Sequence, residues 1–278
     1  RGTNPDGTQT DDHNWFDGTG GKAKPFDDGA HGSHVAGTIA GHADGRTIGV
    51  APGARIIAAK AILGTGQNTT EATLKALQFM LAPTDVNGLH PDPARGADIV
   101  NNSWGNADRN DTTFTDTWDA FQAAGIIMVS AAGNDGPMGK VSPPGSYPNG
   151  ISVAATGPSD KVAGFSSRGP SKFDPSAVIP MIAAPGSGVL SSVPGGRYGE
   201  MSGTSMASPH VAGAIALMLS AKPTASYNEI VKALTSTATD IAEPGPDNAA
   251  GYGRINVNKA IDALLATGST AVAQPAAA

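Results

Sequence analysis

Short apolar runs alternate with amphipathic or small-residue segments along most of this chain. Runs of this length are typical of buried strands, and helical spacing of apolar positions between them is typical of helices packed on a sheet. Strands are predicted at 55–62, 98–104, 125–132, 151–155 and 181–184. Helices are predicted over 31–41, 113–124, 206–221 and 256–265, and behind two capping-box patterns at 68–71 and 226–229. Residues 1–30 read as loop with at most one short strand.

This alternation predicts an α/β fold, a mostly parallel sheet with helices on both faces. In such sheets the reacting groups gather beyond the carboxyl ends of the strands. The loops 63–66, 103–105 and 133–136 are therefore expected at one rim. We expect a single domain over 1–266, followed at 267–278 by an Ala-rich tail or linker.

The most informative segment is 203–221, where small residues lead through Ser205 into an uncharged apolar run. A helix here is apolar nearly all round and must be buried. Pro209 is expected in its first turn, where a missing N–H costs nothing. Ser205 would then lie at the N-terminus, beside free N–H groups and the positive end of the helix dipole. It is either a helix cap or a nucleophile placed to have its oxyanion stabilised.

Composition removes several other classes of function. The 278 residues are 39% hydrophobic and 15% charged, with 37 Gly and 21 Pro, which is typical of a globular chain rich in tight turns. The net charge of −6 argues against a nucleic-acid partner. The absence of cysteine excludes thiol catalysis and disulfides. No apolar run reaches the length needed to span a membrane.

A serine nucleophile needs a base, and histidine is the usual one. Three of the six histidines (His13, His42 and His90) lie in polar loops, and His210 falls inside the predicted buried helix. The remaining pair, His31 and His34, begins a small-residue helix. Their spacing alone is weak evidence for zinc, because the H-E-x-x-H pattern and cysteine ligands are both absent.

Three segments of this chain resemble the signature blocks of the subtilisin-like serine peptidases. They are the histidine block HGSHVAGT at 31–38, the block SAAGNDG at 130–136, and the serine block GTSMASPH at 203–210. Shorter matches occur at 49–53, 165–170 and 184–186, and the resemblance runs in order from about residue 14 to 265. The segment VNNSWG at 100–105 and the long loop 83–97 are similar to the bacillopeptidase F-like branch of this family.

The resemblance implies a subtilisin-like three-layer fold and hydrolysis of peptide bonds through an acyl-enzyme on Ser205. His31 would be the general base, and the Asn134 amide with the Ser205 N–H would form the oxyanion hole. It further implies peptide-binding residues on both sides of an extended substrate and around the pocket before the scissile bond: Leu63, Gly64, Thr65, Gly66, Ser103, Trp104, Gly105, Ala131, Ala132 and Gly133. Small pocket walls leave room for a large apolar side chain, while Asp135 at the rim could favour a basic one.

The family also implies features that the residues themselves do not fix. The chemistry needs no cofactor, but structural calcium is an expectation from the family. Asp27, Asp28 and Asp44 are loop carboxylates that offer oxygen ligands, although they do not form an ordered calcium-loop pattern. Protein or peptide substrates, a propeptide and export from the cell follow from the same resemblance.

One member of the family's triad has no clear counterpart in this chain. The family's aspartate ends an apolar strand within Asp-Ser/Thr-Gly and precedes the histidine. Of the six aspartates before His31, five are candidates for this role, and each is more simply a solvated or capping carboxylate: Asp11, Asp12, Asp17, Asp27 and Asp28. We expect the strand carrying the acid to lie upstream of Arg1, so that the domain is N-terminally incomplete and the acid comes from the protein's own N-terminal segment or propeptide.

Two alternatives remain open. A non-catalytic or truncated relative would keep the fold and bind peptides without turnover. An α/β-hydrolase esterase fits less well, because it requires Gly-x-Ser-x-Gly and Ala207 occupies the last place. In that fold the serine also precedes the histidine in the chain, whereas here it follows.

Overall fold

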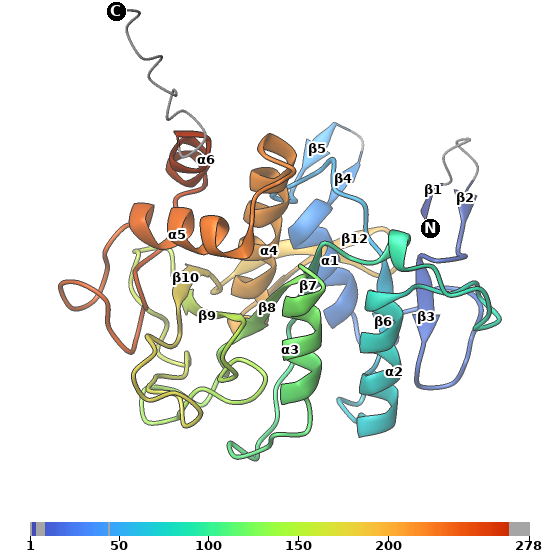
Figure 1. Cartoon of the computed structure of the whole chain (residues 1–278), viewed down its shortest axis with the longest axis horizontal. Helices are drawn as coiled ribbons and strands as arrows, with labels where there is room; N and C mark the ends of the chain where they lie inside the picture. Colours follow the sequence, from blue (N-terminus) through green and yellow to red (C-terminus); the bar gives the residue numbers. More distant parts are fainter. Residues whose placement is uncertain (1, 4–8, 44, 267–278) are drawn as a thin grey trace, which may run out of the picture.

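The computed structural model describes residues 2–3, 9–43 and 45–266 (Figure 1). The possible calcium ligand Asp44 and the predicted tail at 267–278 lie outside the described residues. The division into a domain over 1–266 and a tail therefore stays a prediction.

The elements follow one another in alternation, as the apolar pattern predicts. The helices are α1 (His31–Ala40), α2 (Thr70–Leu81), α3 (Thr115–Ala123), α4 (Thr204–Ala221), α5 (Tyr227–Thr237) and α6 (Val257–Ala266), with a short 3-10 helix at Pro93–Arg95. The strands are β1 (Gly2–Thr3), β2 (Gln9–Thr10), β3 (Trp15–Asp17), β4 (His42–Ala43), β5 (Arg46–Thr47), β6 (Ala58–Lys60), β7 (Ile99–Asn102), β8 (Ile127–Ala131), β9 (Ile151–Thr156), β10 (Ile182–Pro185), β11 (Val189–Val193) and β12 (Arg197–Met201).

The central sheet is parallel, in the order β10-β9-β8-β7. A second parallel pair, β3-β6, lies on the β7 side of this sheet (Figure 1). Within the described residues β6 pairs only with β3, and β7 only with β8. The parallel strands therefore form two groups, each ending in a strand with one unpaired edge.

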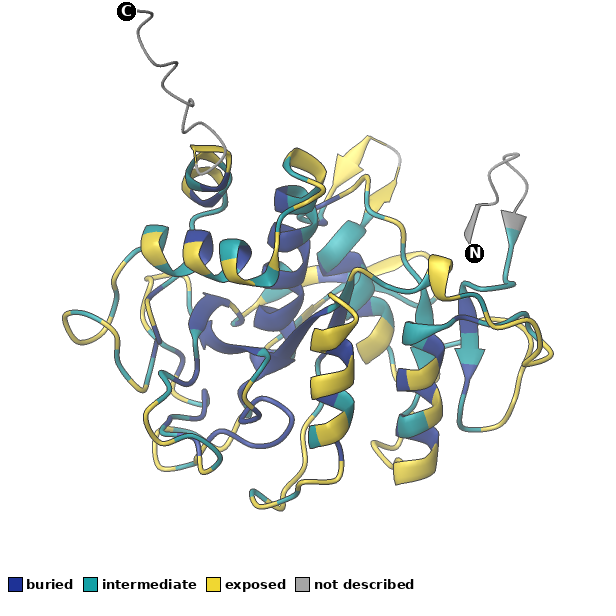
Figure 2. Ribbon diagram, in the orientation of Figure 1, coloured by how far each residue is buried: buried dark blue, intermediate teal, exposed yellow. Residues whose placement is uncertain are grey.

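Helices cover both faces of the central sheet, which buries every residue of β8 and β9 (Figure 2). Alternate residues of β8 face opposite sides, as the pleat requires. Ile127 and Val129 pack with α4, α5 and α6 in the largest core cluster. Met128 packs with Leu77 of α2 and Phe121 of α3 in the second. The predicted α/β architecture, helix on sheet on helix, is confirmed.

Several local predictions need correction. The predicted strand at 55–62 is shorter and corresponds to β6. Residues 1–30 contain β3 and the antiparallel pair β1-β2. The hairpin β11-β12 has no counterpart among the predicted elements. The capping box at 226–229 is confirmed in α5. The one at 68–71 is wrong, because Thr69 is the N-cap of α2 and its hydroxyl accepts from the Ala72 N–H. Glu71 pairs with Lys75 one turn along the helix instead.

Candidate active site

Ser205 is the second residue of α4 and lies at the carboxyl rim of the sheet. The N-cap residue, Gly203, has no side chain, and an oxygen from another element takes the capping role. The Asn134 side-chain oxygen accepts from the Thr204 N–H at 2.8 Å and from the Thr204 hydroxyl at 3.0 Å. Asn134 comes from the loop after β8, so these two bonds fix that loop against the start of α4.

These bonds leave two donors without partners beside the Ser205 hydroxyl. Because the Asn134 oxygen faces Thr204, its NH₂ group points elsewhere, and no hydrogen bond of the described residues involves that group or the Ser205 N–H. The position that a Cβ on Gly203 would occupy lies 3.6 Å from both nitrogens. Two N–H donors at a helix N-terminus therefore border one space that can hold an anionic oxygen.

Pro209 corrects the prediction made for this helix. It is the sixth residue of α4 rather than a first-turn residue. Proline has no N–H, so the carbonyl four residues earlier, that of Ser205, receives no helical hydrogen bond. The Ser103 hydroxyl donates to that carbonyl at 2.8 Å, and the Ser205 hydroxyl donates back to the Ser103 carbonyl at 3.1 Å.

Two further bonds hold Ser103 in this place. The Asn101 amide donates to the Ser103 hydroxyl at 2.9 Å, and Asn101 in turn accepts from the Ser208 hydroxyl at 2.6 Å. The end of β7 is therefore bonded to the first two turns of α4. This chain of bonds positions Ser205 and replaces the helical bond that Pro209 cannot make.

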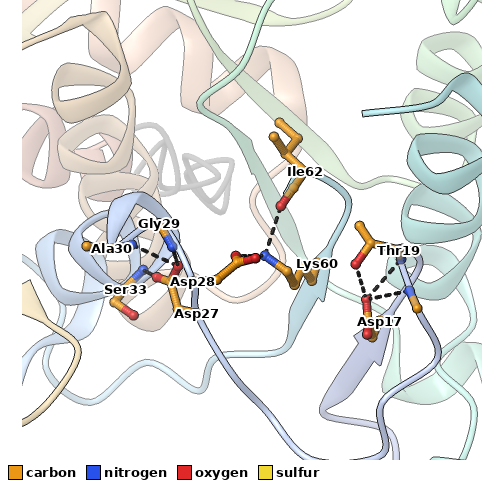
Figure 3. A network of polar contacts seen from close by, with 10 residues as sticks. Asp17, Thr19, Asp27, Asp28, Gly29, Ala30, Ser33, Lys60 and Ile62 are labelled. Carbon is orange, nitrogen blue, oxygen red and sulfur yellow. Dashed lines mark hydrogen bonds and ion pairs between the residues drawn. The ribbon is translucent and has the colours of Figure 1, made fainter. Parts of the chain in front are cut away.

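His31 begins α1, and the turn before it is held by Asp27. The Asp27 carboxylate accepts from the N–H groups of Gly29, Ala30 and Ser33 at 2.8–2.9 Å (Figure 3). These bonds hold Ala30 in a left-handed conformation, with a φ of 64°. Asp27 is thus the carboxylate that caps α1, the structural role expected for it.

The His31 ring makes no hydrogen bond within the described residues, to Ser205 or to any carboxylate. Its pKa lies below the usual value, chiefly because surrounding protein desolvates the ring even though the residue is exposed on the accessible surface. The nearby His34 lowers the pKa further, and Asp27 opposes the shift. A lowered pKa keeps the imidazole neutral, which is the form that accepts a proton.

Asp17 is not the loop residue that the sequence predicted. It ends strand β3 and is buried, with only 6% of its surface exposed. Its carboxylate accepts four bonds from its own turn, from the Thr19 N–H and hydroxyl, Gly20 N–H and Lys22 N–H. Figure 3 shows Asp17 facing Thr19. Burial raises its pKa, but the hydrogen bonds outweigh burial and the net pKa is lowered. The Asp17 carboxylate therefore stabilises its own turn by hydrogen bonds.

Two of the carboxylates considered for calcium, Asp27 and Asp28, are engaged by other groups of the protein. Asp27 is surrounded by N–H donors, and Asp28 pairs with Lys60 at 2.5 Å (Figure 3). Across the described residues no three His, Asp or Glu side chains gather closely enough to hold a metal ion. Nε2 of the buried His34 lies 2.9 and 3.2 Å from two carbonyl oxygens, so Nε2 carries the proton of the ring and holds His34 in the core.

The structure brings the expected peptide-binding segments to this rim. Leu63, Gly64, Thr65 and Gly66 form a tight turn closed by the Gly66 N–H on the Leu63 carbonyl. The Gly64 Cα lies 3.0 Å from where a Cβ of Gly29 would be, so this turn packs directly against the segment leading to His31.

The other two segments approach the same buried side chain, that of Ser142. The positions that a Cβ would take on Gly105 and on Gly133 lie 3.1 and 3.0 Å from the same Ser142 hydroxyl oxygen. Trp104 turns its ring away, into edge-to-face contact with Phe114 and Trp118. Ala131 and Ala132 are buried beside Gly133. Gly105 and Gly133 therefore both border the Ser142 hydroxyl, and we call them the two glycine walls and the place between them the slot.

Sequence reasoning missed two residues of this site, Thr204 and Ser142, and a second role of Ser103, which it expected only as a peptide-binding residue. Thr204 orients the Asn134 amide, the Ser103 side chain supports the Ser205 carbonyl, and Ser142 lies between the two glycine walls. Pro209 four residues after Ser205 was a usable signal, since a proline within a helix requires another donor for the orphaned carbonyl. The other two depend on contacts between segments far apart in the chain.

A serine hydroxyl at a buried helix N-terminus, two adjacent N–H donors and a histidine on the neighbouring helix are the kinds of group that acyl transfer uses. The model of the subtilase family of peptidases matches residues 2–253, and the chain belongs to this family.

Among its relatives, bacillopeptidase F of Bacillus subtilis (strain 168) is 41% identical over 95% of this chain, and subtilisin E of the same organism is 37% identical over 86%. Fervidolysin of Fervidobacterium pennivorans is 34% identical over 86%. The chain spans 19%, 58% and 35% of these three relatives, respectively. The resemblance to the family and to its bacillopeptidase F-like branch is confirmed.

Proposed function

We propose that this protein is a serine endopeptidase in which Ser205 attacks the peptide carbonyl and forms an acyl-enzyme. The observation that carries the proposal is the pair of unpartnered donors, the Asn134 amide and the Ser205 N–H, beside the hydroxyl at the start of α4. Donors fixed in advance around a developing oxyanion stabilise the transition state without reorganisation.

The proposed reaction uses two proton transfers through His31. The Ser205 hydroxyl leaves its hydrogen bond to the Ser103 carbonyl, transfers its proton to His31 and attacks the substrate carbonyl. The oxyanion is held by Asn134 and the Ser205 N–H. His31 then protonates the leaving amine, and water reverses these steps to release the acid.

The orienting carboxylate belongs, in this proposal, to a strand placed between β6 and β7. Both strands have an unpaired edge in the described part of the chain, and unpaired edges of buried parallel strands require a partner. Within the described residues, no carboxylate accepts a hydrogen bond from the His31 ring. The strand would come from the protein's own N-terminal segment or propeptide.

The substrate is proposed to be a protein or peptide, bound in extended form between 63–66 and 103–105. Ala131, Ala132 and Gly133 would line the pocket for the side chain before the scissile bond. Action outside the cell is part of this proposal and rests on the family. No helix in the described ranges is both long and apolar enough to cross a bilayer.

A second candidate is a relative that binds peptides without turnover. The observation in its favour is the His31 ring, which has no carboxylate partner among the described residues. A serine with no oriented base would bind substrate and react slowly, so reactivity at Ser205 separates the two candidates.

Labelling of Ser205 by an organophosphonate is the test. In the full-length protein we expect stoichiometric labelling at Ser205, located by mass spectrometry of the digested adduct. Ser205→Ala should abolish labelling, while Ser220→Ala, at an exposed position on the same helix, should leave it unchanged. A folded protein that resists labelling would show that the site binds without catalysing.

Removing the Ser103 hydroxyl is expected to slow acylation about tenfold, with little change in KM. Ser103→Ala leaves the Ser205 carbonyl without a donor, and an unsatisfied buried polar group costs about 1–3 kcal/mol. Single-turnover acylation rates measure the effect, and Ser103→Thr, which keeps a hydroxyl, should restore most of the rate. Equal acylation by Ser103→Ala and the unmodified protein would exclude this positioning role.

A further inference from the structure

An ion pair lies at the rim of the slot between the two glycine walls. Arg109 comes from the loop after Gly105, and Asp135 follows Asn134 directly. A terminal guanidinium nitrogen lies 2.7 Å from the Asp135 carboxylate, and the other terminal nitrogen donates to the Lys140 carbonyl. Arg109 therefore connects the segment that forms one wall with the segment that forms the other.

Lys140 extends this connection toward the base of the slot. It lies two residues before Ser142, whose hydroxyl lies between Gly105 and Gly133. Its ammonium group donates to the Gly169 carbonyl at 3.0 Å. Asp135 is the residue that the sequence offered as a receptor for a basic substrate side chain, and the Arg109 guanidinium already pairs with its carboxylate.

We propose that Arg109 is a specificity-determining residue, which occupies the Asp135 carboxylate and makes the slot select an apolar side chain before the scissile bond. This inference rests on the proposed function. A lysine or arginine of the substrate would have to displace Arg109 from Asp135 and would meet the positive charge of its guanidinium. An apolar side chain enters between the glycine walls with no charge to pair.

The effect is expected to be moderate because the pair is partly solvated. Side-chain exposure is 27% for Arg109 and 57% for Asp135. Exposed ion pairs are weakened by water and screened by salt. Freeing Asp135 should therefore raise the preference for lysine by about tenfold, and high salt should reduce the gain.

The experiment compares kcat/KM for two matched peptide substrates, with leucine or lysine before the scissile bond, in the full-length protein. Arg109→Gln should raise the lysine-to-leucine ratio about tenfold relative to the unmodified protein. The double variant Arg109→Gln with Asp135→Asn should return the ratio to its starting value. Arg95→Gln is the matched control, since Arg95 forms an exposed pair with Asp92 elsewhere on the surface and should leave the ratio unchanged.

The outcomes separate this inference from the proposed function. If the protein cleaves the peptides but Arg109→Gln changes the lysine-to-leucine ratio by less than twofold, the role of Arg109 is overturned and the proposed peptidase function stands. The role of Arg109 would also be overturned if the unmodified protein already prefers lysine to leucine. The same holds if it prefers an acidic side chain, tested in a third peptide. Absence of both cleavage and organophosphonate labelling would overturn the proposed function, and this inference with it.

Discussion

Replacing Asn134 with alanine is expected to lower kcat by about 10²–10³-fold while KM changes little. That range, equivalent to about 2.7–4 kcal/mol, is the loss known for the oxyanion-hole asparagine of subtilisin. The physical reason is that the amide donates only to charge that develops in the transition state. Steady-state kinetics on a peptide substrate, with active sites counted by organophosphonate labelling, measures the effect.

The structure gives Asn134 a second role that the experiment must separate. Its side-chain oxygen caps α4 through Thr204, so alanine should also lower the free energy of unfolding by about 1 kcal/mol. Asn134→Asp keeps that acceptor and loses the amide donor. We expect this variant to unfold like the parent and still lose at least 10²-fold in kcat. Activity within fivefold of the parent would show that Asn134 is only a cap.

Replacing Trp118 with alanine is expected to lower the free energy of unfolding by about 3–5 kcal/mol. The indole is 1% exposed and lies in edge-to-face contact with Tyr147, with ring centroids 5.5 Å apart, and with Trp104 at 6.4 Å. Its removal leaves a cavity between α3 and the central sheet, next to the wall that contains Gly105. Urea unfolding followed by circular dichroism measures the loss.

Two further variants show whether the loss comes from packing. Trp118→Phe keeps an aromatic ring in the same place and should lose clearly less than alanine. Tyr252→Ala, at a residue that is 38% exposed, should change stability by less than about 0.5 kcal/mol. A loss below 1 kcal/mol for Trp118→Ala would show that this cluster does not support the sheet.

The fold was largely predictable because its strands are short, apolar and separated by helical spacing. β8 and β9 are buried on both faces, so their sequences read as continuous apolar runs. The hairpin β11-β12 was not predictable in this way, because most of its residues are exposed or half-buried. β3 was missed because its signal is three residues long, with an acidic residue at its end.

By itself, the sequence determined the class of fold and the family, through ordered blocks around His31, Asn134 and Ser205. It also placed Ser205 at the start of a buried helix, although it did so by expecting Pro209 in the first turn, where the structure has it as the sixth residue. The roles of these residues remain proposals that labelling and kinetics can test.

Only the tertiary structure decided how their neighbours are used. The Ser103 hydroxyl donates to the Ser205 carbonyl because Pro209 cannot make the helical bond to it. The Asp17 carboxylate accepts hydrogen bonds from its own turn. Arg109 occupies the carboxylate of Asp135 across the slot. In each of these contacts, packing and burial decide which groups meet. The order of residues along the chain does not reveal these pairs.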